Sequence, residues 1–309
     1  MSGDQAVDVC ANCGTESSDA VKLKKCNACH LVKYCSVGCQ KAHRKQHKGA
    51  CKKRAAELKD EQLYGQGLAR SERDSCPICT LPIPFPLAGH SRFFTCCMKM
   101  VCYGCGLAAQ KRGMLETCPF CRSPLKHYSA STTLARVQAR VDANDPDAIS
   151  FLANQYCMGG SGLQVNAPRA VELWTKAAEF GSTEAHFELG TCYSKGEGVA
   201  QDKSKAHRYF ELAAMQGHVI ARHYLGNHET AKGNPGRSVR HYLISAKMGL
   251  EASLETIKSM FVAGQATKMQ YAEALRGYQA AIKETKSPER DEAKPIFDRM
   301  RKSRQQQSK

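Results

Sequence analysis

The chain has neither an apolar N-terminal segment nor a long hydrophobic run, and beyond residue 121 it has almost no cysteine. It begins Met-Ser-Gly-Asp-Gln-Ala-Val-Asp, which is polar and acidic, so we expect no signal peptide and no export to an oxidising compartment. No stretch approaches the roughly 18 apolar residues of a membrane span. These absences favour a protein of the cytoplasm or the nucleus, away from membranes, whose clustered cysteines bind metal.

The cysteines are distributed very unevenly. The 309 residues include 17 cysteines, of which only Cys157 and Cys192 lie beyond Cys121. We interpret these two as small hydrophobic residues of a helical core, because neither has a partner pair nearby. The distribution predicts a fold in two parts: small zinc-stabilised N-terminal modules, followed by an all-α solenoid of helix pairs.

The high positive charge is weaker evidence for nucleic-acid binding than it first suggests. The formal net charge is +16, but zinc binds thiolates, and 15 thiolates with four divalent ions lower it by about 7. The remaining basic residues are dispersed, chiefly over residues 41–54 and 283–309. We interpret both stretches as solvated faces, and nucleic acid is an unlikely partner because no spacing resembles a DNA-reading finger.

The first cysteine cluster offers eight metal ligands in four pairs. They are Cys10, Cys13, Cys26, Cys29, Cys35, Cys39, His47 and Cys51. Cys-x-x-Cys pairs bring two sulfurs onto one ion through a tight turn, and an i, i+4 spacing puts two ligands on one helix face. Eight ligands therefore make two closed tetrahedral zinc sites, which stabilise a small domain and hydrolyse nothing.

The second half of this cluster follows a family pattern. It consists of Lys33, Tyr34, Cys35, Ser36, Cys39, Gln40, His47, Lys48 and Cys51. The pattern resembles a MYND zinc finger, a protein-interaction module, over residues 10–51. The resemblance implies that one ion is held by the first and third pairs, Cys10, Cys13, Cys35 and Cys39, and the other by Cys26, Cys29, His47 and Cys51.

The same resemblance implies a binding surface. Short proline-containing peptides would be received near Tyr34, Ser36 and Gln40. His43 departs from the pattern, because the family usually has a tryptophan there that often floors the peptide groove. His43 is also an alternative ligand by its spacing, but the distance along the chain to Cys51 favours His47.

The second cluster again offers eight ligands. They are Cys76, Cys79, Cys96, Cys97, Cys102, Cys105, Cys118 and Cys121. The Cys-Pro-Ile-Cys start and the Cys-Pro-Phe-Cys-Arg end resemble a RING finger over residues 76–122. The resemblance implies that Cys76, Cys79, Cys102 and Cys105 hold one ion, and that Cys118 and Cys121 help to hold the second. With the first cluster, the chain would bind four zinc ions.

The second of these sites departs from the RING pattern. Lys99 stands where the family has histidine, and a protonated lysine cannot bind zinc. Cys96 next to Cys97 would complete an all-cysteine site without leftover thiols, and we favour it. His90, which would reach in from the preceding loop, remains the alternative.

The RING resemblance implies a ubiquitin ligase that acts by positioning a ubiquitin-conjugating enzyme, with no covalent catalytic residue of its own. Ile78, Pro119 and Arg122 match the residues that dock this enzyme, and an arginine fork suits the last position. The alternative is that Ile78 and Pro119 only shape the zinc turns. The chain would then be a non-catalytic adaptor with a degenerate RING.

Residues 132–285 carry an internal repeat. Ala177-Ala178-x-x-Gly181 recurs 36 residues later at Ala213, and Leu189-Gly190 recurs as Leu225-Gly226. This period is typical of stacked helix pairs, and the pattern resembles Sel-one-like repeats, relatives of the tetratricopeptide repeats. Residues 52–75 are expected to form a helical linker and residues 286–309 a basic C-terminal helix and tail. We expect helices over 268–284 and 288–302 to cap the stack.

Overall fold

The computed structural model describes residues 8–125 and 129–307. They fall into two compact units, one ending at Gly65 and the other beginning at Gln66. Each unit is described separately below. The last two residues of the predicted C-terminal tail lie outside the described residues.

The N-terminal unit combines one small hairpin with one long helix. Strands β1 (Lys24–Lys25) and β2 (Lys33–Tyr34) pair antiparallel, and α1 spans Val37–Gly65. Among the described residues, the buried core of the hairpin region consists of Cys10, Cys26, Cys29 and Tyr34. So little apolar surface cannot fold about 40 residues unaided, which means that the stability of this unit depends on metal binding.

Helix α1 is longer than the first cysteine cluster requires. It carries Cys39, His47 and Cys51 and then continues to Gly65, with Leu63 as its buried residue. The expected helical linker over 52–75 is thus helical only in its first part, as a continuation of the zinc-binding helix. The part from Gln66 onward has an irregular course and ends in a short 3₁₀ helix, η1 (Glu72–Asp74).

The second unit begins with the other cysteine cluster. It contains the 3₁₀ helix η2 (Leu87–Gly89), the strands β3 (Ser91–Phe94) and β4 (Lys99–Cys102), and the helix α2 (Tyr103–Lys111). The strands form an antiparallel hairpin in which Ser91 pairs with Cys102 and Phe94 with Lys99. Ile83, Phe94 and Val101 pack between the cysteines and form the core of this module.

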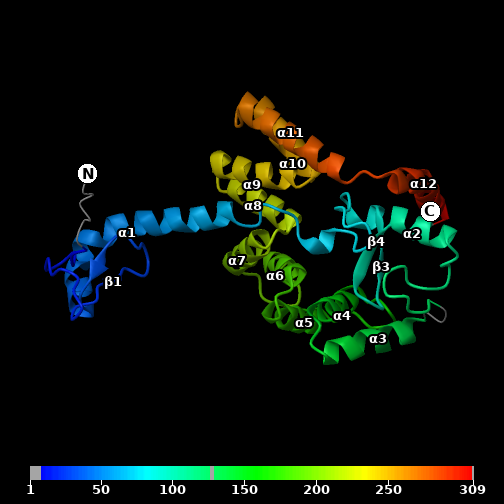
Figure 1. The fold of residues 1–309 in the computed structure, drawn as a ribbon, viewed down its shortest axis with the longest axis horizontal. Helices are drawn as coiled ribbons and strands as arrows, with labels where there is room; N and C mark the ends of the chain where they lie inside the picture. Colours follow the sequence, from blue (N-terminus) through cyan, green and yellow to red (C-terminus); the bar gives the residue numbers. More distant parts are fainter. Residues whose placement is uncertain (1–7, 126–128, 308–309) are drawn as a thin grey trace. The chain divides into compact units, whose positions relative to one another are not determined.

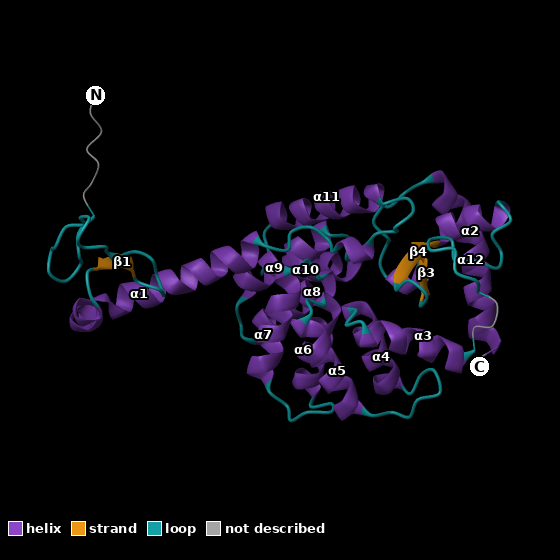
Figure 2. Cartoon of the chain, turned by 60° about the horizontal axis from the view of Figure 1, so that its bottom comes forward, coloured by secondary structure: helices purple, strands orange, loops and turns teal. Residues whose placement is uncertain are grey.

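The rest of the unit is a stack of antiparallel helix pairs (Figure 1). The helices are α3 (Ala130–Asp142), α4 (Pro146–Met158), α5 (Ala167–Glu179), α6 (Thr183–Lys195), α7 (Lys203–Met215), α8 (Val219–Ala231), α9 (Pro235–Lys247), α10 (Glu251–Val262) and α11 (Lys268–Glu284). The expected all-α solenoid after the zinc modules is therefore present, and Figure 2 shows strands only outside it.

The repeated residues explain the regular geometry of the stack. Asp145 and Asp202 accept hydrogen bonds from the backbone N–H groups that begin α4 and α7, as an N-cap should. Gly190 in α6 lies against the ring of Phe210, where an added Cβ would come within 2.6 Å of the ring. Gly226 meets Tyr242 in the same way one repeat later. The repeated glycines therefore let an aromatic ring of the next helix pack closely.

The C-terminal helix α12 (Pro288–Gln307) does not cap the stack, so that part of the expectation is wrong. It packs instead against α2 of the second cysteine module, as Figures 1 and 2 show. The ring of Phe297 stacks on that of Tyr103 with their centroids 3.9 Å apart. Helix α11, in contrast, packs on α9 and α10 as expected.

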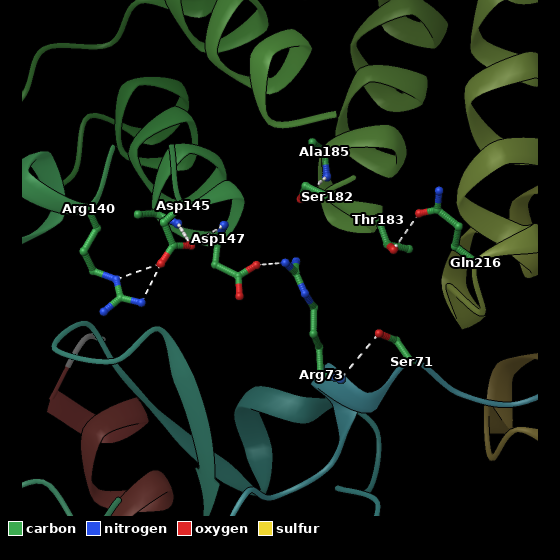
Figure 3. Close-up of polar contacts among 10 residues, drawn as sticks. Ser71, Arg73, Arg140, Asp145, Asp147, Ser182, Thr183, Ala185 and Gln216 are labelled. Carbon is green, nitrogen blue, oxygen red and sulfur yellow. Dashed lines mark hydrogen bonds and ion pairs between the residues drawn. The ribbon is translucent and has the colours of Figure 1, made fainter. Parts of the chain in front are cut away.

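The segment from Gln66 to Asp74 is docked along the repeats. Gln66 offers its carbonyl to the fully buried Arg222, and the backbone at Gly67 lies against the end of α7. At the other end of the segment, Arg73 forms an ion pair with Asp147 at the start of α4 (Figure 3). The segment thus crosses the N-terminal ends of α4 and α8.

This docking predicts that replacing two equivalent glycines by alanine destabilises the protein by different amounts. Gly181 and Gly217 end α5 and α7 with φ of +83° and +84°, but only at Gly217 would a Cβ meet the docked segment, 2.4 Å from the carbonyl of Ala69. We expect Gly181→Ala to lower the free energy of unfolding by about 1–2 kcal/mol, for backbone strain alone. Gly217→Ala should lower it by roughly 1–3 kcal/mol more. Denaturant unfolding measures both, and equal losses would contradict the docking.

A partly buried carboxyl in α6 predicts a change of stability with pH. Burial, reinforced by neighbouring Glu184, raises the pKa of Glu188 to about 7. The folded protein therefore keeps a proton that the unfolded chain has already lost above its ordinary pKa of 4.5, so stability falls as the pH rises toward 7. Glu188→Gln should remove this loss. Its stability advantage over wild type should widen by about 1–2 kcal/mol between pH 5.5 and pH 8 in zinc-containing buffer.

Glu184 provides the matched control for that measurement. Burial acts to raise its pKa, but the hydrogen bond from His218, 3.3 Å away, outweighs burial and holds the pKa below its ordinary value. Glu184→Gln, made in the Glu188→Gln background so that it cannot act through Glu188, should therefore destabilise the protein above pH 5, the opposite sign. Thermal denaturation that shows the same trend for both variants would contradict this account of Glu188.

Candidate metal centres

The structure brings all sixteen predicted ligands together in four tetrads, two in each unit. The first is Cys10, Cys13, Cys35 and Cys39, the second Cys26, Cys29, His47 and Cys51, the third Cys76, Cys79, Cys102 and Cys105, and the fourth Cys96, Cys97, Cys118 and Cys121. Within each tetrad the ligand atoms lie within 4.8 Å of one another. These groups have the interleaved pairing that both family resemblances imply.

The distances between ligand atoms suit a shared metal and not a covalent bond. Cys35 and Cys39 have their sulfurs 3.5 Å apart, Cys26 and Cys51 3.8 Å, and Cys97 and Cys118 3.9 Å. A disulfide would bring two sulfurs to about 2.05 Å. Tetrahedral zinc with Zn–S bonds of about 2.3 Å places its ligand sulfurs about 3.8 Å apart. The four tetrads are thus consistent with four zinc ions.

Four of the Cys-x-x-Cys pairs share one backbone turn. In each, the residue after the second cysteine has a left-handed φ and donates its N–H to the carbonyl of the first cysteine. These residues are Gly14, His30, Thr80 and Arg122, with φ of +74°, +58°, +59° and +62° and N···O distances of 2.8–3.0 Å. The turn leaves both sulfurs on the same side, which is why this spacing supplies ligands in pairs.

The other ligands are placed mainly by helices. Cys39, His47 and Cys51 all lie on α1, where residues four apart share a face. Cys102 is the N-cap of α2, and its sulfur lies 3.4 Å from the N–H of Cys105. A thiolate is favoured at a helix N-terminus, because the exposed N–H groups there carry partial positive charge.

The structure places Cys96, not His90, beside Cys97, Cys118 and Cys121. The sulfurs of Cys96 and Cys121 are 3.4 Å apart. His90 instead follows η2, where its backbone N–H donates to Leu87 and its carbonyl accepts from Tyr103. Lys99, at the position of the family's histidine, is exposed on β4.

One of the three residues expected to form the peptide surface of the first module is buried. Tyr34 is only 3% exposed and donates or accepts a hydrogen bond at 3.1 Å with Nδ1 of His43. The ring of His43 also stacks on that of His47, with centroids 5.8 Å apart. Tyr34 therefore packs inside the module, while Ser36 and Gln40 lie at its surface.

The three candidate docking residues of the second module lie on its two matching turns. Ile78 is 42% exposed in the turn between Cys76 and Cys79. Pro119 is partly buried in the turn between Cys118 and Cys121, and Arg122 is exposed at the end of that turn. The Arg122 guanidinium reaches the sulfur of Met114. Sequence reasoning missed Phe120, which is 43% exposed beside Pro119.

The two remaining cysteines belong to the solenoid. Cys192 is buried and Cys157 packs against the same core around Trp174. Burial raises the pKa of Cys192 to about 12, so that its thiol stays protonated at neutral pH. Both cysteines act as small apolar side chains, as expected. In the described part of the chain, no helix is both long and apolar enough to cross a membrane.

Comparison with protein families agrees with two of the three modules. Residues 10–51 match the MYND finger, and residues 146–182 and 183–218 match the Sel1 repeat. The chain is a multi-module zinc-binding protein with an N-terminal MYND finger and Sel1 repeats. The second cysteine cluster is an additional zinc module that these matches do not identify as a RING finger.

Similar proteins share only part of the chain. The protein named DAP3-binding cell death enhancer 1 from Rattus norvegicus is 38% identical over 106 residues, 33% of this chain and 20% of that protein. Chitin synthase regulatory factor 2 from Schizosaccharomyces pombe is 28% identical over 120 residues, 37% of this chain and 23% of that protein. The chain thus aligns with about a fifth of the length of these relatives.

Among solved structures, a Sel1 repeat protein from Oxalobacter formigenes aligns with a TM-score of 0.46 and 22% identity, over 57% of this chain and 72% of that one. The c5321 protective antigen of uropathogenic Escherichia coli aligns with a TM-score of 0.43 and 25% identity, over 50% of this chain and 33% of that one.

The tetrads predict the metal content of the purified protein. We expect four zinc ions per chain by atomic emission, falling to about three in Cys96→Ala, because a site with three thiolates binds zinc far more weakly. His90→Ala and Cys157→Ala should each keep four. Loss of zinc in His90→Ala but not in Cys96→Ala would reverse the assignment of the fourth tetrad.

Proposed function

We propose that the chain is a protein-interaction protein whose second zinc module docks a ubiquitin-conjugating enzyme, while the MYND finger and the repeats select the substrate. The observation that carries this proposal is the pair of matching turns at Cys76–Cys79 and Cys118–Cys121. Each turn is fixed by zinc ligands on both sides and presents an apolar side chain to solvent, Ile78 on one and Phe120 on the other.

The closed metal sites support a function in which the protein binds and positions a partner protein. Four protein ligands leave no coordination position for water or substrate, so zinc here builds surfaces and takes no part in hydrolysis. A ligase of this kind needs only to hold a thioester-linked ubiquitin in a reactive arrangement. The exposed guanidinium of Arg122, next to the last ligand, can contact two proteins at once through its planar fork.

The second candidate function is a non-catalytic adaptor. It is favoured by the segment between Cys105 and Cys118, which has no tryptophan of the kind that many active RING fingers place toward the conjugating enzyme. In that case the exposed turns would bind another protein, and the MYND finger would still bind short proline-containing peptides. Both functions belong in the cytoplasm or the nucleus, where reduced cysteines remain available to zinc.

A ubiquitination assay separates the two. Purified full-length protein is incubated with activating enzyme, ATP, ubiquitin and a panel of conjugating enzymes, and chain formation is measured. We expect chains with at least one conjugating enzyme, and a loss of about tenfold or more in Ile78→Ala and in Arg122→Ala, because each truncates a contact at the centre of the interface.

The controls remove similar groups from the repeats. Val262 is 82% exposed at the end of α10, and Arg208 is exposed on α7. Val262→Ala and Arg208→Ala should leave chain formation unchanged. If wild type forms no chains with any conjugating enzyme, or if Arg122→Ala has no effect, the ligase function fails and the adaptor function is retained.

A further inference from the structure

The C-terminal helix brings an arginine to the third tetrad. Arg290, in the first turn of α12, places Nη2 3.3 Å from the sulfur of Cys79, a residue more than 200 positions earlier in the chain. The same nitrogen donates to the carbonyl of Leu81 at 3.0 Å. The other nitrogen, Nη1, donates to the carbonyls of Pro82 and Thr285. One guanidinium thus holds a ligand sulfur and the two residues that follow its turn.

The position of Arg290 is fixed by the packing of α12 on α2. Gly104, buried in the first turn of α2, lies so close to α12 that an added Cβ would meet the backbone N of Arg290 at 2.7 Å. Farther along, the rings of Tyr103 and Phe297 stack, and Lys111 pairs with Glu292. The guanidinium is therefore presented by a helix that is itself anchored at three points.

The chemistry of the third tetrad calls for such a group. Four thiolates around one Zn²⁺ carry a net charge of −2, and all four cysteines are buried or partly buried, Cys76 and Cys102 fully so. A charge held away from water is costly unless it is paired. A charge-assisted N–H···S contact offsets part of this cost in free energy and fixes the orientation of the ligand cysteine.

We propose that Arg290 is a positioning residue of this zinc site, so that the second zinc module is completed by the C-terminal helix. The module then does not end at Arg122. Its zinc-binding turn is held from outside by α12, and removal of that contact loosens the Cys79 side of the third tetrad while the fourth tetrad, which contains no contact with Arg290, keeps its ion.

Site-resolved alkylation tests this proposal on the full-length protein. Wild type, Arg290→Ala and Arg290→Lys are exposed to N-ethylmaleimide with a zinc chelator, and the modification of each cysteine is followed by mass spectrometry. In Arg290→Ala we expect the four cysteines of the third tetrad to be alkylated about tenfold faster, the usual effect of losing a partner of a metal ligand. Those of the fourth tetrad should keep the wild-type rate. Arg290→Lys should be intermediate, because lysine keeps the charge but lacks the fork.

Lys294→Ala is the matched control. It removes an equal charge from an exposed position one turn along α12, and should leave both tetrads unchanged. Equal acceleration in the third and fourth tetrads would mean that Arg290 only supports the fold of the module, and would overturn the proposal. Wild-type rates in both tetrads would overturn it as well. Should Arg290→Ala not fold, the same comparison is decided by Arg290→Lys.

Discussion

The constraint on which the structure depends is that thiolates can be gathered in a small space only if a metal neutralises them. In the first module the buried core is three cysteines and one tyrosine, and no amount of packing at that size offsets the conformational entropy of its chain. The backbone follows from the ligands. Two turns of the same form, each with a left-handed residue after the second cysteine, aim four sulfurs in pairs, and α1 supplies Cys39, His47 and Cys51.

The second zinc module, unlike the first, packs against the large hydrophobic core of the repeats. Its hairpin contributes Met98 to the cluster around Trp174, and Phe93 stacks on Phe151 of α4 with centroids 5.4 Å apart. Arg140 of α3 donates to the carbonyl of Cys96 at 3.5 Å. On its other side α12 returns to cover α2. Zinc stabilises the fold of the module, but the repeats and the C-terminal helix hold it in place. The module is therefore part of the same compact unit as the repeats and not an independent domain.

Local pattern predicted most of this architecture. Ligand spacing predicted the cysteine and histidine pairs, because each pair is made by a turn or a helix of fewer than six residues, and the family resemblances implied how the pairs combine into tetrads. The repeat predicted the helix pairs, because caps and glycines recur with it. Helix α11 begins and ends at the expected residues, Lys268 and Glu284. The errors lie in contacts between distant segments. Nothing in the composition of residues 286–309 distinguishes a helix that caps the stack from one that covers α2, since that choice depends on Gly104 leaving room for the distant backbone of Glu289 and Arg290. The docked course of residues 66–74 was missed for the same reason.

These contacts also limit where a partner can bind the second module. The face of α2 that carries Tyr103 and Gly104 is covered by α12, and the tip of the hairpin packs on α3 and α4. Within the described residues, the apolar side chains that the module still presents on its zinc turns are Ile78 and Phe120. Each turn is short and tied to a closed zinc site, so it is rigid before any partner arrives, and binding there loses little conformational entropy. Two rigid, exposed apolar side chains suit a folded partner that must be held in one orientation, whether a conjugating enzyme or another protein. They suit a flexible peptide less well, because such a peptide would adapt its conformation to the surface.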